Sequence, residues 1–376
     1  MATSGPDSTQ AKSTYPPKCD ICVKRQKHVL ATCMCHDCDM AMCVDCEFTH
    51  SVTCKSHDVR KLSHIAKEGS SVDFEMMETD VGSVASSMPE LEQDADVPRD
   101  GDIPRFALLK VFSSEVEDDE VPPDVRSVLV LKSGVILATD WANCSLKAFN
   151  QNGTFLGDHY FDKKGNDAGR IMGVCQKDED TVLVTLPSLR MIATITIKLR
   201  EGKVTFLPVM HTTKRRYFGI AHLSETKQVL AGTTDTVDIL TYSARFITSV
   251  AKNTFENPYN MATESPTSAL VSDTKQNCLF RIRADQRVKR IHVDDTTVRL
   301  RGVTADDDGN VFFCGLKSEG IGWVNIKDEI MGNVLPGGSC LRDAVGISFK
   351  KTDCGRQLAV SVSCGDVKVY KVTYGA

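Results

Sequence analysis

Residues 105–376 alternate between short apolar runs, rich in β-branched and aromatic residues, and turns built from Gly, Asn and Asp. The first stretch shows the pattern, because the runs RSVLVL, GVILATD, SLKAFN and TFLGDHYF follow one another at residues 126–161. Runs of this length, with no long helical period between them, predict consecutive β-strands joined by tight turns. This part of the chain is therefore predicted to be mainly β.

The four-strand pattern occurs six times. When the repeats are aligned at the start of their first strands, they are separated by 46, 46, 41, 42 and 44 residues. A four-stranded unit that recurs about every 40–50 residues is typical of a propeller blade. We therefore predict a mainly β protein with a six-bladed β-propeller at residues 105–376. The six repeat positions are Ser127, Gly173, Gly219, Asn260, Gly302 and Gly346.

The last repeat lacks one strand. Only TYGA remains after its third run, DVKVYKV, whereas RFALLKVF at residues 105–112 precedes the first repeat and belongs to none. We expect residues 105–112 to be the outermost strand of blade six. Such a strand would close the ring and leave no unpaired edge in that blade.

Blade one resembles an NHL repeat, in which a strand that ends in Asp is followed by Asn, by a strand that ends near Phe, and by Asn-Gly. The matching residues are Asp140, Asn143, Phe149 and Gly153, and Asp273 and Asn277 repeat the first two in blade four. The resemblance implies an NHL-like propeller, a kind of domain that can bind single-stranded RNA.

The segment from Cys19 to His57 contains eight cysteines and four histidines. Three successive Cys-x2-Cys pairs dominate its spacing, and two residues between cysteines turn both sulfur atoms toward one ion. A segment of about 40 residues cannot bury enough apolar surface to fold unaided, so a metal would have to stabilise it. The pattern predicts two Zn²⁺ ions. Eight protein ligands leave no open position for a catalytic water.

This spacing resembles the B-box zinc finger of the tripartite-motif family, and is nearer its type 1 form because the second ligand is Cys22. B-boxes are cross-braced, which implies that the first zinc is held by Cys19, Cys22, Cys43 and Cys46. The second would be held by Cys35, Cys38, His50 and His57. Cys54 and His64 remain alternative ligands for the second site.

Two features of the tripartite-motif family are missing from the sequence. Only 18 residues precede Cys19, too few for a RING finger, and no segment sustains three heptads. Residues 68–104 contain eleven acidic residues and one basic residue, and such a composition favours disorder. The predicted organisation is a disordered N-terminus (1–16), a B-box-type finger (17–64), an acidic disordered linker (65–104) and the propeller (105–376).

The composition also predicts the cellular compartment of the protein. Of the 376 residues, 41% are hydrophobic and 25% are charged, as in an ordinary soluble protein. No apolar run reaches the roughly 18 residues of a membrane span, and the N-terminus lacks the apolar region of a signal peptide. The seven cysteines beyond the finger are scattered singly, which favours reduced thiols. These features predict a cytoplasmic protein without a membrane partner, with the nucleus as the alternative.

Motifs of known enzyme classes are scarce. The sequence contains no G-x-S-x-G, no phosphate-binding Gly-rich loop and no H-E-x-x-H. The run DDDGN at residues 306–310 is better explained by a hairpin turn than by a Ca²⁺ loop, because Lys317 stands where the bidentate acid would be required. We predict no catalytic residues and no small-molecule substrate.

One face of the predicted disc gathers basic and aromatic residues. The loop before the first strand of each blade and the loop between its second and third strands open on the same side, which we call the top face. Cations interleaved with aromatic rings suit single-stranded RNA or an acidic peptide, although the same arginines could brace the blades. The candidates are Arg126, Trp141, Arg170, Arg190, Lys214, Arg215, Arg216, Tyr217, Tyr259, Lys275, Arg301 and Arg342.

The sequence therefore predicts a zinc-binding, non-catalytic adaptor of the tripartite-motif type. Its propeller would recognise a protein target, within ubiquitin-linked or innate-immune-type regulation, and its finger would associate with other tripartite-motif proteins. The alternative is single-stranded RNA binding and post-transcriptional regulation through the basic top face. Ubiquitin-ligase activity without a RING is a weaker alternative.

Overall fold

The computed structural model describes residues 19, 33–35, 40–42, 59–61, 103–161, 169–291, 293, 299–316, 320–325, 330–335, 341 and 343–374. The chain divides into two compact units, Met1–Ala95 and Asp96–Ala376. In the first unit, β1 (Cys33–Cys35) pairs antiparallel with both β2 (Met40–Met42) and β3 (Val59–Lys61). Among the described residues, no helix is long and apolar enough to cross a bilayer.

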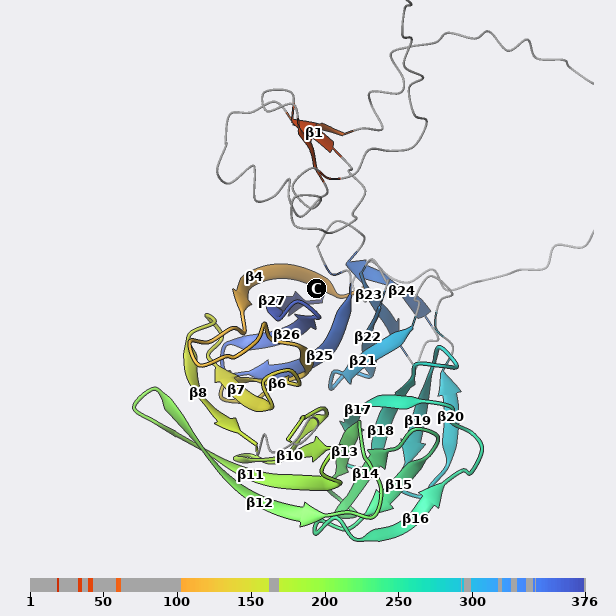
Figure 1. The fold of residues 1–376 in the computed structure, drawn as a ribbon. Coiled ribbons are helices and arrows are strands. Elements are labelled where there is room, and N and C mark those ends of the chain that lie inside the picture. The colour runs from red at the N-terminus through yellow and green to blue at the C-terminus, as the bar shows by residue number, and fades with distance from the viewer. Residues whose placement is uncertain are drawn as a thin grey trace, which may run out of the picture. The chain divides into compact units, whose positions relative to one another are not determined.

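The second unit is a six-bladed β-propeller, in which six four-stranded antiparallel sheets surround an axis (Figure 1). Blade one contains β5 (Val125–Val130), β6 (Ile136–Asp140), β7 (Ser145–Phe149) and β8 (Phe155–Tyr160). Blade two contains β9 (Val174–Asp178), β10 (Thr181–Leu186), β11 (Met191–Arg200) and β12 (Lys203–Thr212). Blade three contains β13 (Ile220–Leu223), β14 (Gln228–Gly232), β15 (Val237–Leu240) and β16 (Phe246–Val250).

The remaining blades follow the same order. Blade four contains β17 (Pro258–Ser265), β18 (Ser268–Asp273), β19 (Cys278–Arg283) and β20 (Val288–Ile291). Blade five contains β21 (Leu300–Ala305), β22 (Asn310–Gly315), β23 (Ile321–Asn325) and β24 (Ile330–Leu335). Blade six contains β25 (Ala344–Thr352), β26 (Gly355–Val362) and β27 (Asp366–Thr373), with β4 (Arg105–Ser113) outside them. The six-bladed fold predicted from the repeats is thereby confirmed.

The ring closes through β4, which comes from the start of the propeller sequence and pairs antiparallel with β27 at its end. Phe106 of β4 packs edge-on against Phe312 of blade five and Tyr370 of blade six. Phe112 packs against Phe149 of blade one, with 5.1 Å between ring centroids. One strand therefore contacts three consecutive blades, and its position coincides with the expected closing strand at residues 105–112.

The innermost strands approach one another so closely that four of the six repeat positions are glycine. A Cβ added at Gly173 would lie 2.5 Å from the carbonyl oxygen of Phe218 in the next blade. At Gly219 it would lie 2.9 Å from the carbonyl oxygen of Tyr259, and at Gly346 it would lie 2.9 Å from Cα of Ser127. These contacts are shorter than side chains tolerate, so the packing of neighbouring inner strands explains why the repeat positions are small.

Each of the six interfaces between neighbouring blades also contains a hydrogen bond between a serine or threonine hydroxyl and the backbone of the neighbour; the hydroxyls of Thr304 and Ser348 accept from a backbone amide. Thr185 shows the arrangement, because its hydroxyl accepts from the Gly173 amide of its own blade (2.8 Å) and donates to the Phe218 carbonyl of the next (2.6 Å). The hydroxyls, in order around the ring from the blade one–two interface, belong to Thr139, Thr185, Thr263, Ser272, Thr304 and Ser348.

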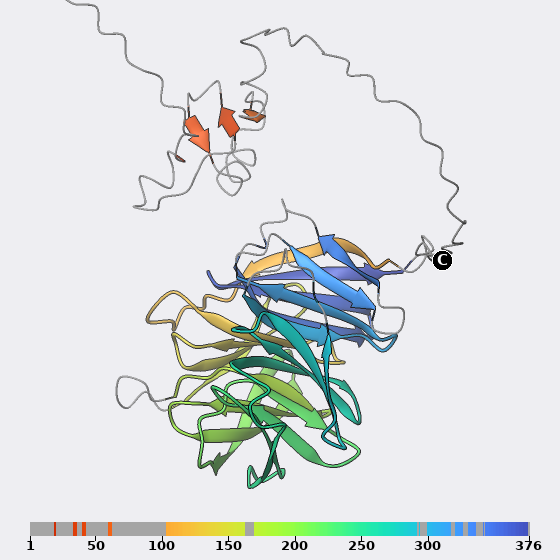
Figure 2. The same ribbon diagram turned by 90° about the vertical axis from the view of Figure 1, so that its right-hand side faces the viewer.

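The apolar core lies between adjacent sheets, which stand side by side around the axis (Figure 2). One cluster packs Leu137 and Leu146 of blade one against Val182 and Ile195 of blade two. Each cluster joins a blade to its neighbour, so the stability of one blade depends on the blades beside it.

We predict that replacing Thr185 with Val destabilises the propeller by about 2 kcal/mol or more. The substitution nearly conserves volume but leaves the Gly173 amide and the Phe218 carbonyl without their partner, and each buried unsatisfied group costs about 1–3 kcal/mol. The measurement is the free energy of unfolding in urea. The control is Thr205→Val on the exposed surface of β12 in the same blade, which we expect to change stability by less than about 0.5 kcal/mol. Equal stabilities of the two variants would contradict the role of this hydroxyl.

Candidate functional site

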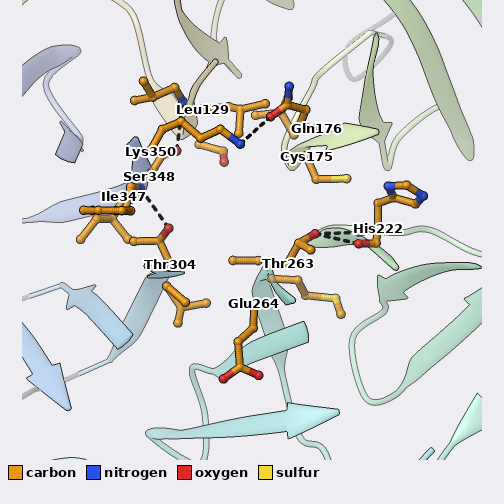
Figure 3. A pocket seen from close by; sticks show the side chains of 18 of the residues that line it. Leu129, Cys175, Gln176, His222, Thr263, Glu264, Thr304, Ile347, Ser348 and Lys350 are labelled. Carbon is orange, nitrogen blue, oxygen red and sulfur yellow. Dashed lines mark hydrogen bonds between the residues drawn. The ribbon is translucent and has the colours of Figure 1, made fainter. Parts of the chain in front are cut away.

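An axial cavity of about 460 Å³ lies between the six innermost strands, and polar side chains surround it (Figure 3). Lys350 of blade six donates to Oε1 of Gln176 in blade two across 3.1 Å. Nε2 of His222 lies 2.7 Å from the Tyr242 hydroxyl, and burial lowers the pKa of His222. Glu264 is held by Arg281 and by the Ser268 hydroxyl. Each of these side chains in the cavity wall thus has a polar partner.

A buried ion cluster organises the top of blade one. Lys147 is fully buried, and its ammonium nitrogen lies 2.6 Å from Asp119, 2.8 Å from Asp140 and 3.1 Å from the Ser114 carbonyl. Burial alone would raise the pKa of Asp140, but the hydrogen bonds from Lys147 and Asn143 outweigh it and lower that pKa. Asp140 also accepts from the backbone amide of Asp124, so the cluster fixes the start of β5.

The residues that carry the NHL resemblance are structural in this propeller. Asn143 is buried and hydrogen-bonds Asp140 and the backbone at Val121. Phe149 packs on Phe112. Gly153 has a φ of +81°, and a Cβ there would meet the Phe112 ring at 2.5 Å. The motif in blade one therefore stabilises the loops and the closing strand.

Basic residues at the junction of blades two and three line a cleft of about 490 Å³ on the top face, which we call the rim cleft. The loop between β12 and β13 supplies Lys214, Arg215 and Arg216, and the turn between β10 and β11 supplies Arg190. Lys252, which the sequence analysis missed, enters from the loop after β16. Hydroxyl and amide groups complete the lining together with one acid: Thr233, Thr234, Asp235, Thr236, Ser249 and Asn253.

Other candidates of the top face are partly structural. Arg215 lies 3.2 Å from Asp238, which is fully buried, and the Tyr217 hydroxyl donates to the same carboxylate at 2.9 Å. Tyr217 is only 3% exposed and belongs to the core. Lys275 is exposed and pairs with Glu256 at 2.9 Å. The bracing role that the sequence left open therefore holds for part of the set.

A second group of candidates lies on the top face at blades one, two, four and five. The guanidinium carbons of Arg126 and Arg170 lie 5.7 and 5.3 Å from the ring centroid of Trp141, within the range of a cation–π contact. The guanidinium carbon of Arg301 lies 3.9 Å from the ring centroid of Tyr259. Arg342 lies outside the described residues.

The top face also carries acids that the sequence analysis did not place there. Ser114 follows β4 and donates its amide to the Gly365 carbonyl, in the loop between β26 and β27, so the segment at 114–124 lies on the top face. Its exposed acids are Glu115, Glu117, Asp118 and Glu120. The top face is therefore acidic beside blades six and one and basic at blades two and three.

Most of the predicted zinc ligands lie outside the described residues. Cys19 and Cys35 are described, and both are buried. The remaining six, which are Cys22, Cys38, Cys43, Cys46, His50 and His57, are not. The described residues bring together no group of three or more potential metal ligands. The two zinc sites thus stay a prediction.

Neither a family model nor a curated protein matches the chain. Among solved structures, a catalytically inactive variant of virginiamycin B lyase from Staphylococcus aureus, with quinupristin, is 14% identical, with a TM-score of 0.52 over 72% of this chain and 100% of that one. A streptogramin B lyase is 12% identical (TM-score 0.51; 71% and 98% covered). A protein of unknown function from Bacteroides thetaiotaomicron is 11% identical (0.51; 72% and 76%). At such identities the likeness shows the fold alone, a six-bladed β-propeller.

We predict that Lys147→Met destabilises the propeller by about 3–5 kcal/mol, because it leaves two buried carboxylates without their cation. The folded-state pKa of Asp140 is lowered from 3.8, so its contribution to wild-type stability is present above pH 3.8 and is lost as the pH falls through the folded value. Unfolding free energies measured in urea between pH 7 and pH 3 should show this loss in the wild type and not in Lys147→Met. The exposed Lys132→Met in the same blade is the control. A Lys147→Met protein as stable as the control would contradict the role of the cluster.

Proposed function

We propose that this protein is a non-catalytic adaptor whose propeller binds an acidic segment of a partner protein in the rim cleft. The observation that carries the proposal is the lining of the cleft, which contains five cations and one carboxylate; one of the five, Arg215, is paired with buried Asp238. The cations are Arg190, Lys214, Arg215, Arg216 and Lys252. Such an excess of one charge raises the local concentration of an oppositely charged partner and accelerates its association.

Apolar side chains beside the rim cleft add a second requirement for the partner. Phe246 and Ile247 of β16 are 48% and 50% exposed, and the guanidinium carbon of Arg215 lies 5.6 Å from the Phe246 ring centroid. Exposed apolar groups next to basic ones favour a segment that alternates acidic and apolar residues. A protein segment can carry both kinds of group.

Single-stranded RNA is the alternative ligand, and two features of the top face weigh against it. Trp141 and Tyr259 are already in contact with guanidinium groups, whereas a base needs an accessible ring for stacking. A strand that crossed the face would also approach the exposed acids of the segment at 114–124. A compact acidic segment at blades two and three avoids this repulsion.

The cysteine-rich segment belongs to the same proposal as a zinc finger for partner association. Its Cys-x2-Cys spacing supports two tetrahedral Zn²⁺ sites of the B-box kind. A finger and a propeller in one chain would let the protein hold two partners at once. The association of the finger with other tripartite-motif proteins rests on the resemblance of that spacing.

We predict that reversing Arg190, Lys214 and Arg216 to Glu weakens binding of an acidic peptide by at least about tenfold. Arg215 is left intact because it pairs with buried Asp238. The measurement is fluorescence anisotropy with a labelled peptide of alternating Glu and Leu, and a labelled ten-nucleotide uridine RNA is the second probe. The control reverses three exposed bases at the far end of blade two, Lys198, Arg200 and Lys203.

Unchanged peptide affinity in the triple reversal at the cleft would contradict the proposal. If instead the RNA binds more tightly than the peptide and is lost in the same variant, the nucleic-acid alternative holds. Thermal unfolding of each variant shows whether the propeller has remained folded.

We predict two zinc ions per full-length chain, because eight ligands in this spacing complete two tetrahedral shells. Cys43→Ser should lower the zinc content and leave the melting temperature of the propeller unchanged, since the metal stabilises the finger. The control is Cys354→Ser, which alters an exposed thiol of the propeller and should leave two zinc ions. Metal content is measured by mass spectrometry. A wild-type content of one or none contradicts the assignment.

A further inference from the structure

The residue before each repeat position lies in an innermost strand or two residues before its start, at the top end of the blade. In blades one, four, five and six a β-bulge interrupts the ladder at this point. A bulge adds a residue that is not paired and turns its side chain away from the regular direction. We call the six residues at this level the axial mouth. They are Arg126, Met172, Phe218, Tyr259, Arg301 and Val345.

Three residues of the axial mouth meet although they come from three different blades. Arg126 of blade one donates from Nη1 to the hydroxyl of Tyr259 in blade four, at 3.4 Å. Blades one and four stand on opposite sides of a six-bladed ring, so this contact crosses the axis. Arg301 of blade five stacks on the ring of the same tyrosine, with its guanidinium carbon 3.9 Å from the ring centroid.

The charge of this group is incompletely balanced. Arg126 pairs with Asp124, whereas Arg301 forms no ion pair with any residue that the structure describes. The Nε atoms of both arginines are buried and have no hydrogen-bond partner among the described residues. Burial, followed by repulsion from Arg126 and Arg299, lowers the pKa of Arg301. Two guanidinium groups are thus held beside one tyrosine near the axis, and among the described residues only that of Arg126 is paired with a carboxylate.

Lys147 shows how another buried cation of the propeller is balanced. Lys147 is also a buried cation at the top of a blade, but Asp119 and Asp140 neutralise it at 2.6 and 2.8 Å. A cation that only supports the fold is expected to have such partners, because an unpaired buried charge is destabilising. Among the residues that the structure describes, Arg301 has no such partner, and its side chain is half-buried.

We propose that the axial mouth is a binding site for a terminal phosphate group, held between Arg126 and Arg301 with the Tyr259 hydroxyl as a further donor. A guanidinium group presents a planar fork of N–H donors that matches the oxygens of phosphate, and two forks can share one tetrahedral dianion. The dianion would supply a negative charge to Arg301 and further hydrogen-bond acceptors to both guanidinium groups, whose Nε atoms have no partner among the described residues. This site is separate from the rim cleft and does not depend on the function proposed for that cleft.

The test is the affinity of full-length protein for inorganic phosphate, measured by calorimetry at constant ionic strength set with chloride. We expect Arg301→Met to weaken phosphate binding by about tenfold or more, and to leave the melting temperature unchanged or raised because a poorly balanced charge is removed. The control is Arg283→Met, which removes the same charge from an exposed position at the far end of β19 and should bind within about twofold of wild type.

Tyr259→Phe provides a second variant, because it keeps the ring beneath Arg301 and removes only the hydroxyl; we expect a weakening of several-fold. The triple reversal in the rim cleft should retain phosphate binding at the mouth, which separates the two sites. A phosphoserine peptide that binds more tightly than free phosphate identifies a phosphorylated protein as the source. Equal affinities show that the site recognises the phosphate group alone.

Three outcomes would overturn the proposal. They are the absence of phosphate binding by the wild type, unchanged affinity in Arg301→Met, and a large fall in the melting temperature of that variant. The last would show that Arg301 braces the blades.

Discussion

A serine or threonine hydroxyl at every interface between neighbouring blades is the contact on which the ring depends. Backbone ladders hold each blade together, but among the described strands no ladder runs from one blade to the next near the axis. There, a hydroxyl such as that of Thr185 satisfies a backbone group of the neighbouring blade at a distance that glycine at the repeat position permits. The hydroxyl and the glycine therefore depend on each other, since a larger side chain at the repeat position would separate the backbones that the hydroxyl joins.

The same close packing of the innermost strands determines where binding sites can lie. The hydroxyls fix the position of every innermost strand along the propeller axis. The residue just before each repeat position therefore lies near the axis, whatever its identity. Arg126, Tyr259 and Arg301 meet for this reason, although 42 residues separate the closest two in the sequence. The loops farther from the axis are less constrained, and they supply the rim cleft from two blades.

The sequence predicted the fold well because the fold repeats. Glycine at four of six repeat positions and alternating apolar runs report local packing, which recurs with every blade. The sites were harder to predict because they depend on contacts between blades. Nothing local to Tyr217 indicates that its hydroxyl reaches buried Asp238, and the acids of the segment at 114–124 reach the top face only because β4 closes the ring. One usable signal was overlooked, namely Lys147 in the middle of a strand that is otherwise apolar or small, a position that requires an acidic partner.

Charged residues at the top face have two physical roles. The two roles are distinguished by whether the charge is paired with a buried opposite charge. Lys147 is enclosed by carboxylates and fixes the entrance to blade one, and Arg215 fixes Asp238 in blade three. In both cases the acid is buried and the pair stabilises a loop. Arg301 has a half-buried guanidinium, an aromatic ring beneath it and another arginine nearby. Packing alone does not favour such an arrangement, because Met or Leu would fill the same volume without the cost of a desolvated charge. An unbalanced cation that persists where an apolar residue would fit is best explained by an anion that it binds.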